Sequence, residues 1–189
     1  IVIISFIIIV GIVLRFHQLG VVPVGLGWDE ATIGYNGWSV WTTRRDEWLN
    51  RLPFSFRSFG DYKAPLAIYL NGPFTLLFGM NAFAVRLPFF LFACATLIVW
   101  WRLLELIRKQ LQLSQWFVAF GVTILVFSPW HFVFSRIAFE SVISLFFVVF
   151  GVWMTLTALE SQKRQTVLFL LAGLSFVGSL YAYHSAKIV

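Results

Sequence analysis

The sequence predicts an all-α membrane protein, a polytopic helical bundle whose large first loop lies outside the membrane and carries interfacial helices. Of its 189 residues, 60% are hydrophobic and only 12% are charged, and the mean hydropathy is +0.86. A soluble domain of this size does not need so much apolar surface. Several uncharged stretches are also long enough to cross a hydrocarbon core of about 30 Å as helices.

The first element is an apolar run at residues 1–14, which we interpret as the first membrane span. At 1.5 Å per residue it covers about 21 Å, less than the membrane core. We therefore expect a truncated first helix and an N-terminal fragment whose C-terminal remainder is absent. A signal peptide is the alternative. No small-residue cleavage site follows the run, however, and Arg15-Phe16-His17 fits an interfacial helix end better.

Four further spans are expected where uncharged stretches reach helical membrane length, at 87–107, 114–135, 140–159 and 166–184. Short polar breaks separate them at 102–109, 136–140 and 160–164. The segment 15–86 is expected to form the outer loop, because it starts with a Gly/Pro-rich stretch and holds most of the charges.

Residues 64–85 are uncharged over 22 positions, yet Asn71-Gly72-Pro73 lies at their middle. Proline within a helix removes a backbone hydrogen bond. The pattern therefore favours a pair of interfacial helices lying on the membrane. The alternative, in which this segment crosses, would place the outer loop on the opposite side.

If residues 64–85 do not cross the membrane, the distribution of basic residues predicts which loops face the cytoplasm. Its inner loops carry five basic residues, Arg102, Arg108, Lys109, Lys163 and Arg164, which mark the cytoplasmic side. A raw charge count favours the crossing version, but the rule is unreliable for loops beyond roughly 60 residues. The basic residues behind the net charge of +6 are scattered among the spans. Contact with anionic lipid, or the enrichment of basic residues in cytoplasmic loops, therefore explains the charge better than binding of nucleic acid does. The single cysteine, Cys94, cannot form an internal disulfide.

The acidic pair Asp29-Glu30 is the leading catalytic candidate. Carboxylates near lipid are costly and usually mark function, and a general base or a metal ligand at the membrane surface fits this position. The alternative is a helix start, with Asp29 as an N-cap and Glu30 as an acid in the first turn. The two roles are compatible.

Two basic residues are candidates for binding a donor phosphate, Lys63 and Arg136. Lys63 could instead snorkel at the end of an apolar segment. Arg136 and Glu140 are four residues apart, so a structural ion pair is the alternative for both.

The remaining candidates for substrate binding share the outer side in this topology: Asp61, Tyr62, His131, Glu140, Tyr183 and His184. For His131 and His184, an interfacial histidine is the simpler interpretation. Tryptophans in the loop fit either membrane-interface anchors or sugar-stacking surfaces, namely Trp28, Trp38, Trp41 and Trp48. No His/Cys cluster has metal spacing and no Gly-rich phosphate loop is present. We assign no metal ligand, although a divalent cation stays open.

These motifs in order resemble the GT-C glycosyltransferases, in particular glycosyltransferase family 39 and its bacterial relatives. The resemblance rests on five short segments at compatible spacing: Trp28-Asp29-Glu30, Asp61-Tyr62-Lys63-Ala64-Pro65, Phe78-Gly79-Met80-Asn81, Ser128-Pro129-Trp130-His131 and Tyr181-Ala182-Tyr183-His184. It implies a multi-helix bundle with a large outer loop. It also implies a multi-pass protein of the bacterial inner membrane with its active site on the periplasmic face.

The resemblance implies inverting transfer of a sugar from a polyprenyl-phosphate donor to an acceptor hydroxyl on a glycan, lipid or protein. Asp29 would be the general base and Lys63 would contact the donor phosphate. Relatives often carry an acid or His directly before this lysine, whereas here Tyr62 stands there and Asp61 one position earlier. This departure puts metal binding in doubt. The rival hypothesis is a non-catalytic transporter or channel subunit for lipid-linked substrates, but no inverted repeat is visible.

Overall fold

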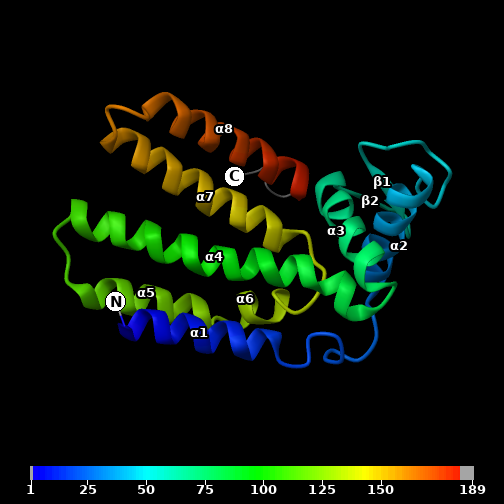
Figure 1. Ribbon diagram of the computed structural model, residues 1–189, viewed down its shortest axis with the longest axis horizontal. Helices are drawn as coiled ribbons and strands as arrows, with labels where there is room; N and C mark the ends of the chain where they lie inside the picture. Colours follow the sequence, from blue (N-terminus) through cyan, green and yellow to red (C-terminus); the bar gives the residue numbers. More distant parts are fainter. Residues whose placement is uncertain (1, 184–189) are drawn as a thin grey trace.

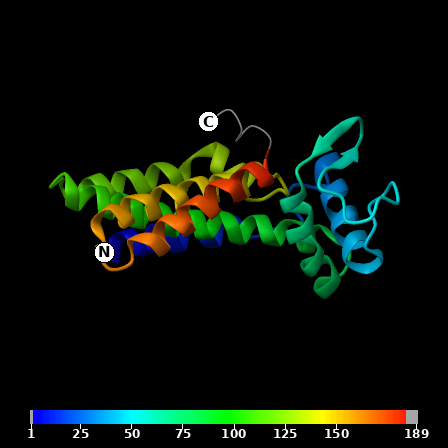
Figure 2. The same ribbon diagram turned by 90° about the horizontal axis from the view of Figure 1, so that it is seen from above.

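The computed structural model describes residues 2–183 and shows a bundle of helices with a smaller unit at one end (Figures 1 and 2). The bundle helices are α1 (Val2–Phe16), α4 (Ala82–Gln110), α5 (Gln115–Phe127), α6 (Pro129–Phe134), α7 (Ser141–Glu160) and α8 (Gln165–Ala182). The end unit contains α2 (Trp28–Thr43), β1 (Phe56–Ser58), β2 (Asp61–Lys63) and α3 (Pro65–Phe78). The predicted all-α membrane class is confirmed.

Helix α4 is the centre of the bundle and packs against α1, α5 and α7, while α7 also packs along α8. Among the described residues, α4, α7 and α8 are long and apolar enough to cross a membrane, whereas α1, α3 and α5 are shorter apolar helices. The seam between α1, α4 and α5 is apolar and includes Ile8, Leu97 and Val122. Many other apolar side chains stay exposed on the bundle surface, as expected of helices that contact lipid.

The helix break predicted at Asn71-Gly72-Pro73 is wrong, because α3 continues through Pro73. Pro73 cannot donate to the carbonyl of Tyr69, four residues earlier. The indole Nε1 of Trp41 on α2 donates to that carbonyl instead, at 2.9 Å. The interruption that the sequence suggested is therefore repaired by a neighbouring helix. Helix α3 lies across the end of the bundle beside α2 (Figure 2).

The predicted single span 114–135 is also corrected, because it divides into α5 and α6. Ser128 adopts an extended conformation with φ −60° and ψ 121°. A residue before proline is disfavoured in the helical region, so Pro129 ends α5 and begins α6. The 13 residues of α5 alone cover only about 20 Å.

A short β-hairpin, not predicted from the sequence, precedes α3. Its register pairs Phe56 with Lys63 and Ser58 with Asp61. The two turn residues, Phe59 and Gly60, both have positive φ, 47° and 82°, as a type I′ hairpin turn requires. The hairpin places Lys63 immediately before the first turn of α3.

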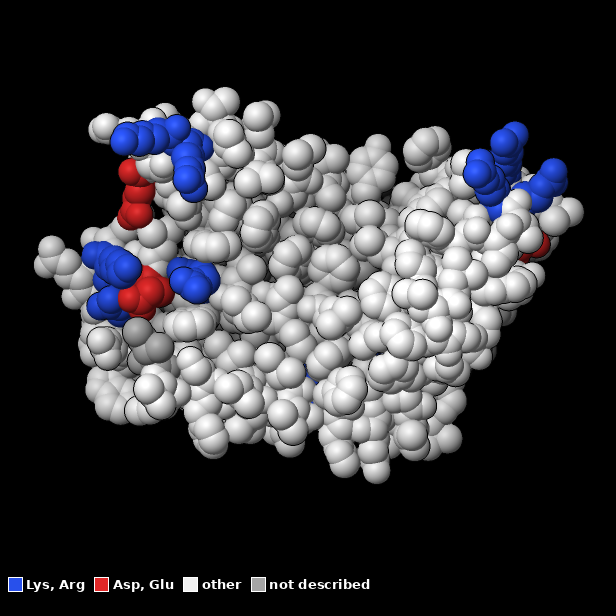
Figure 3. Space-filling model, viewed as in Figure 1, with Lys and Arg blue, Asp and Glu red and all other residues white. Residues whose placement is uncertain are grey.

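Charged residues gather at the two ends of the molecule, with an uncharged band between them (Figure 3). Helices α1, α6 and α8 end, and α4 and α7 begin, toward the end that holds α2, α3 and the hairpin (Figure 1). We call this the loop end, and the opposite end the basic end. This arrangement matches the version of the topology in which residues 64–85 do not cross.

Candidate active site

The centre of the candidate site is an ion pair between Asp29 and Lys63. Gly27 is the N-cap of α2, which places Asp29 in its first turn. Lys63 Nζ lies 2.5 Å from Asp29 Oδ1; the lysine side chain is 10% exposed and the aspartate side chain 45%. The pair thus joins an accessible carboxylate to a largely buried ammonium.

Two further carboxylates surround this lysine. Asp61 Oδ2 lies 3.8 Å from Lys63 Nζ on the exposed side, and the buried Glu140 interacts with it electrostatically. Burial opposes the charge on Lys63, but the hydrogen bond to Asp29 and the charges of Glu140, Asp29 and Asp61 outweigh burial and raise its pKa. Lys63 therefore stays protonated at physiological pH.

Glu140 is the residue that precedes α7, and it is 3% exposed. Burial raises its pKa; Lys63 opposes the rise, while Asp29 and Asp61 add to it. A carboxyl group with a raised pKa beside a cation is a common feature of functional sites. The structure therefore brings Asp29, Lys63, Asp61 and Glu140 into one electrostatic cluster.

Glu30 belongs to a different, buried ion pair with Arg86 of α4. Arg86 Nε donates to Glu30 Oε1 at 2.8 Å and Nη2 donates to Oε2 at 3.1 Å. The backbone N–H groups of Gly27 and Ala138 also donate to this carboxylate, each at 3.0 Å. Burial disfavours the charged form of Glu30, but these hydrogen bonds outweigh it and lower its pKa.

Two buried arginines fix the backbone that leads to Asp29. Arg86 donates to the carbonyls of Leu19, Pro23 and Gly25 at 2.6–3.1 Å. Arg136 donates to the carbonyls of Leu14, Arg15 and Val22 at 3.0–3.1 Å. No ion pair joins Arg136 to Glu140 within residues 2–183. The guanidinium of Arg136 is thus bound to backbone.

A groove of about 610 Å³ borders Asp29, and residues 23–30 and 137–139 line it. Its size lies within the usual range for ligand sites, about 300–1,000 Å³. Trp28 and Phe139 contribute aromatic surface to the groove. The Tyr183 ring lies 5.8 Å from that of Phe139, so Tyr183 also stands beside the groove.

Three other candidates take different places. His131 lies apart from the acidic cluster in its contacts: Arg15 Nη2 donates to its Nδ1 at 3.1 Å, and its buried Nε2 has no partner among the described residues. Tyr62 is exposed on β2 opposite Arg57. His184 lies outside the described residues. Within residues 2–183, no three acidic, His or Cys side chains are grouped to hold a metal ion.

Sequence reasoning gave no role to Arg86 or Arg15, although both are fully buried. The available signal was position: each charge lies at the edge of a long apolar run, where an unpaired charge is costly. Arg86 donates mostly to backbone carbonyls of a loop without regular structure, whereas Arg15 donates to the carbonyls of Gly11 in α1 and Val126 in α5. The sequence holds no pattern for such partners.

Comparison with known protein families gives a match over most of the chain. Residues 62–186 match the family model described as dolichyl-phosphate-mannose-protein mannosyltransferase. The matched segment includes Lys63, Arg86, Arg136 and Glu140 and begins after Asp29. The chain has no significant match among curated proteins or solved structures.

Proposed function

Since the chain belongs to the dolichyl-phosphate-mannose-protein mannosyltransferase family of GT-C membrane glycosyltransferases, we propose that it transfers a sugar from a polyprenyl-phosphate donor to an acceptor hydroxyl with inversion. One observation carries the proposal: the Asp29–Lys63 ion pair lies beside an open groove at the loop end of the bundle. The pair supplies a carboxylate for the acceptor and a cation for the donor phosphate.

Lys63 is the group we assign to the donor phosphate. The bond from the sugar C1 to the phosphate oxygen breaks, and its electron pair stays on the leaving lipid phosphate, which becomes a dianion. A fixed cation beside that oxygen stabilises the developing charge. The raised pKa of Lys63, caused by the surrounding carboxylates despite burial, keeps it charged for this task.

Asp29 is the group we assign to the acceptor. The acceptor oxygen forms the new bond to C1 from the opposite face, and its proton passes to the carboxylate of Asp29. In the free protein Asp29 Oδ1 contacts Lys63. A bound donor phosphate would share that ammonium, so Oδ2 is the atom that we assign to the acceptor proton.

The other candidates then divide by position. Glu30 and Arg136 become positioning residues, because their polar atoms are bound to protein groups. We keep Asp61, Glu140 and Tyr183 as substrate-contact residues around Asp29 and Lys63, because they border the pair or the groove. Tyr62 keeps the same role from the exposed strand β2.

Sugar transfer by membranes carrying the protein tests the proposal. With a radiolabelled polyprenyl-phosphate sugar as donor, Asp29→Asn should lower transfer about 10²–10⁴-fold at normal protein abundance. Lys63→Ala should weaken donor binding as well as turnover. Glu47→Gln is the matched control, an exposed acid in the same loop, and should retain activity. Unchanged transfer by Asp29→Asn would overturn its role as base.

The same proposal places the loop end on the periplasmic face of the bacterial inner membrane. Ser55→Cys, at an exposed loop position, should react with an impermeant thiol reagent on intact cells. Lys163→Cys, at the basic end, should react only after lysis. The native Cys94 is buried and serves as the unlabelled background. The reverse labelling pattern would refute the orientation.

A further inference from the structure

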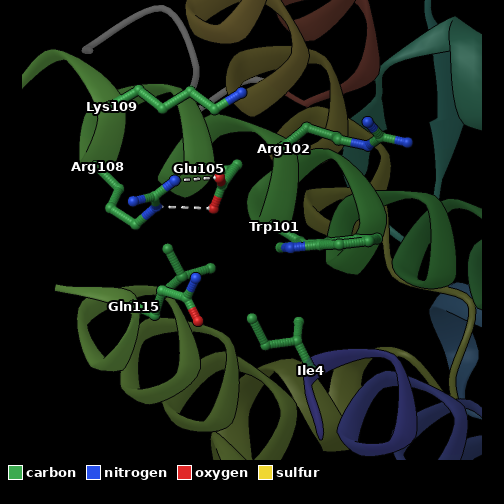
Figure 4. Close-up of a pocket in the computed structure, with 8 residues that line it drawn as sticks. Ile4, Trp101, Arg102, Glu105, Arg108, Lys109 and Gln115 are labelled. Atoms are coloured by element: carbon green, nitrogen blue, oxygen red, sulfur yellow. Dashed lines mark hydrogen bonds and ion pairs between the residues drawn. The ribbon is translucent and has the colours of Figure 1, made fainter. Parts of the chain in front are cut away.

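A second pocket lies at the basic end of the bundle, opposite the Asp29–Lys63 pair. It has a volume of about 500 Å³ and lies between α1, α4 and α5 (Figure 4). Its lining combines apolar, aromatic and charged side chains: Ile4, Trp101, Arg102, Glu105, Arg108, Lys109, Gln115 and Val118. The proposed transfer reaction uses none of them.

The pocket has an excess of positive charge. Arg108 donates two hydrogen bonds to Glu105, at 2.6 and 3.1 Å, so this pair is neutral overall. Arg102 and Lys109 form no ion pair with an acid within residues 2–183, which leaves two positive charges beside the pocket. The guanidinium of Arg102 lies 5.2 Å from the centre of the Trp101 ring, which holds it by a cation–π contact.

The polarity of the lining changes along the bundle. The buried side chains of Ile4 and Val118 lie on the bundle side, whereas Arg102 and Lys109 are exposed. Figure 3 shows that the charged groups end where the uncharged band begins. Such a gradient fits a ligand with an anionic head and an apolar body whose axis runs along the helices.

We propose that this pocket binds the phosphate headgroup of an anionic phospholipid from the membrane leaflet at the basic end. Basic pockets between membrane helices are suited to anionic lipid headgroups, and their Lys and Arg residues act at short range. The phosphate would contact Arg102 and Lys109, and the glycerol and upper acyl chains would lie against Ile4 and Val118. The site is independent of the transfer site at the loop end.

Lipid binding to the purified membrane protein, measured by native mass spectrometry, tests this proposal. Phosphatidylglycerol should bind at least tenfold more tightly than phosphatidylcholine. Each basic residue beside an anionic headgroup contributes about fivefold, so the double variant Arg102→Gln/Lys109→Gln should lose about 25-fold in phosphatidylglycerol affinity. Both residues are exposed, so folding should be unaffected.

The matched control is Lys163→Gln/Arg164→Gln, which removes the same charge from the same end of the bundle but outside the pocket lining. It should change phosphatidylglycerol affinity less than threefold. Equal losses in both double variants would show general surface attraction and overturn the proposal. Displacement of the lipid by millimolar inorganic phosphate would also overturn it, because a small-anion site would explain the charge. Equal affinities for phosphatidylglycerol and phosphatidylcholine would also overturn the proposal.

Discussion

Replacement of Glu30 by Gln tests whether the buried Arg86–Glu30 pair holds the active-site loop. The substitution keeps the shape of the side chain and removes its charge. Glu30 Oε1 accepts from Arg86 Nε and from the Ala138 N–H, and Oε2 accepts from Arg86 Nη2 and from the Gly27 N–H. A glutamine oxygen can replace one of these two acceptors, but its NH₂ group would face two donors.

The expected loss of stability follows from these contacts. Arg86 is fully buried and the Glu30 side chain is 8% exposed, so water does not compensate for the lost charge. Breaking a buried ion pair by removing one partner costs about 3–5 kcal/mol, because the other charge stays buried. The two lost hydrogen bonds to a charged group, at about 1.5–3 kcal/mol each, give a similar figure. Total stabilities are only about 5–15 kcal/mol, so this loss is large.

Reversible unfolding in mixed micelles, followed by circular dichroism, measures the effect. Glu105→Gln is the control, because it breaks a similar two-bond contact with Arg108 at the basic end, where the two side chains are 33% and 22% exposed; pairs that water reaches contribute little. A change below about 1 kcal/mol for Glu30→Gln, the level of a surface ion pair, would refute the anchoring role. Loss of transfer activity with unchanged stability would instead restore Glu30 as a catalytic candidate.

Three further outcomes are expected. Gly72→Ala should destabilise the protein by about 1–3 kcal/mol, since its Cβ would overlap the Trp41 ring and crowd the backbone oxygen of Gly37. Gly173→Ala, with open space around it, should cost no stability; thermal unfolding of the two variants tests the difference. Asn81→Ala removes the side-chain cap of α4 and should cost about 1 kcal/mol in the same assay. The lowered pKa of Glu30 stabilises the fold above its ordinary value of 4.5, and this stability should fall as the pH drops through the lower folded value; Glu30→Gln should flatten that acid limb.

Hydropathy and charge predicted the bundle because they depend on composition along one helix at a time. The spans expected at 87–107 and 140–159 overlap α4 and α7, where uninterrupted apolar sequence leaves no competing signal. Interruptions were harder to interpret. Pro129 ends a helix, whereas Pro73 does not, and the carbonyl that Pro73 cannot bond accepts from the indole of Trp41, a partner that no local pattern reveals.

The sequence predicted only those parts of the candidate site that show in the local pattern of polar and apolar residues. Asp29 and Lys63 were identified as polar residues at the edges of apolar runs, and the structure pairs them. The roles of Glu30 and Arg136 depend on contacts over more than a hundred residues, with Ala138 and Leu14. An i,i+4 spacing suggested an ion pair for Arg136, but its guanidinium donates to two carbonyls at the end of α1 and to the loop carbonyl of Val22.

The loop before Asp29 explains why charge is buried here at all. Residues 19–27 form no helix or strand, so their carbonyls need donors from elsewhere. Arg86 donates to three of these carbonyls, whereas Arg136 donates to one of them and to two carbonyls at the end of α1. Each arginine donates from a planar fork, which a lysine could not match, and the carbonyls together with Glu30 compensate the buried charges. Both arginines belong to the bundle side of the site. The position of Asp29 is therefore set by the start of α4 and by the joint between α6 and α7, so substitutions there should alter transfer without touching a substrate.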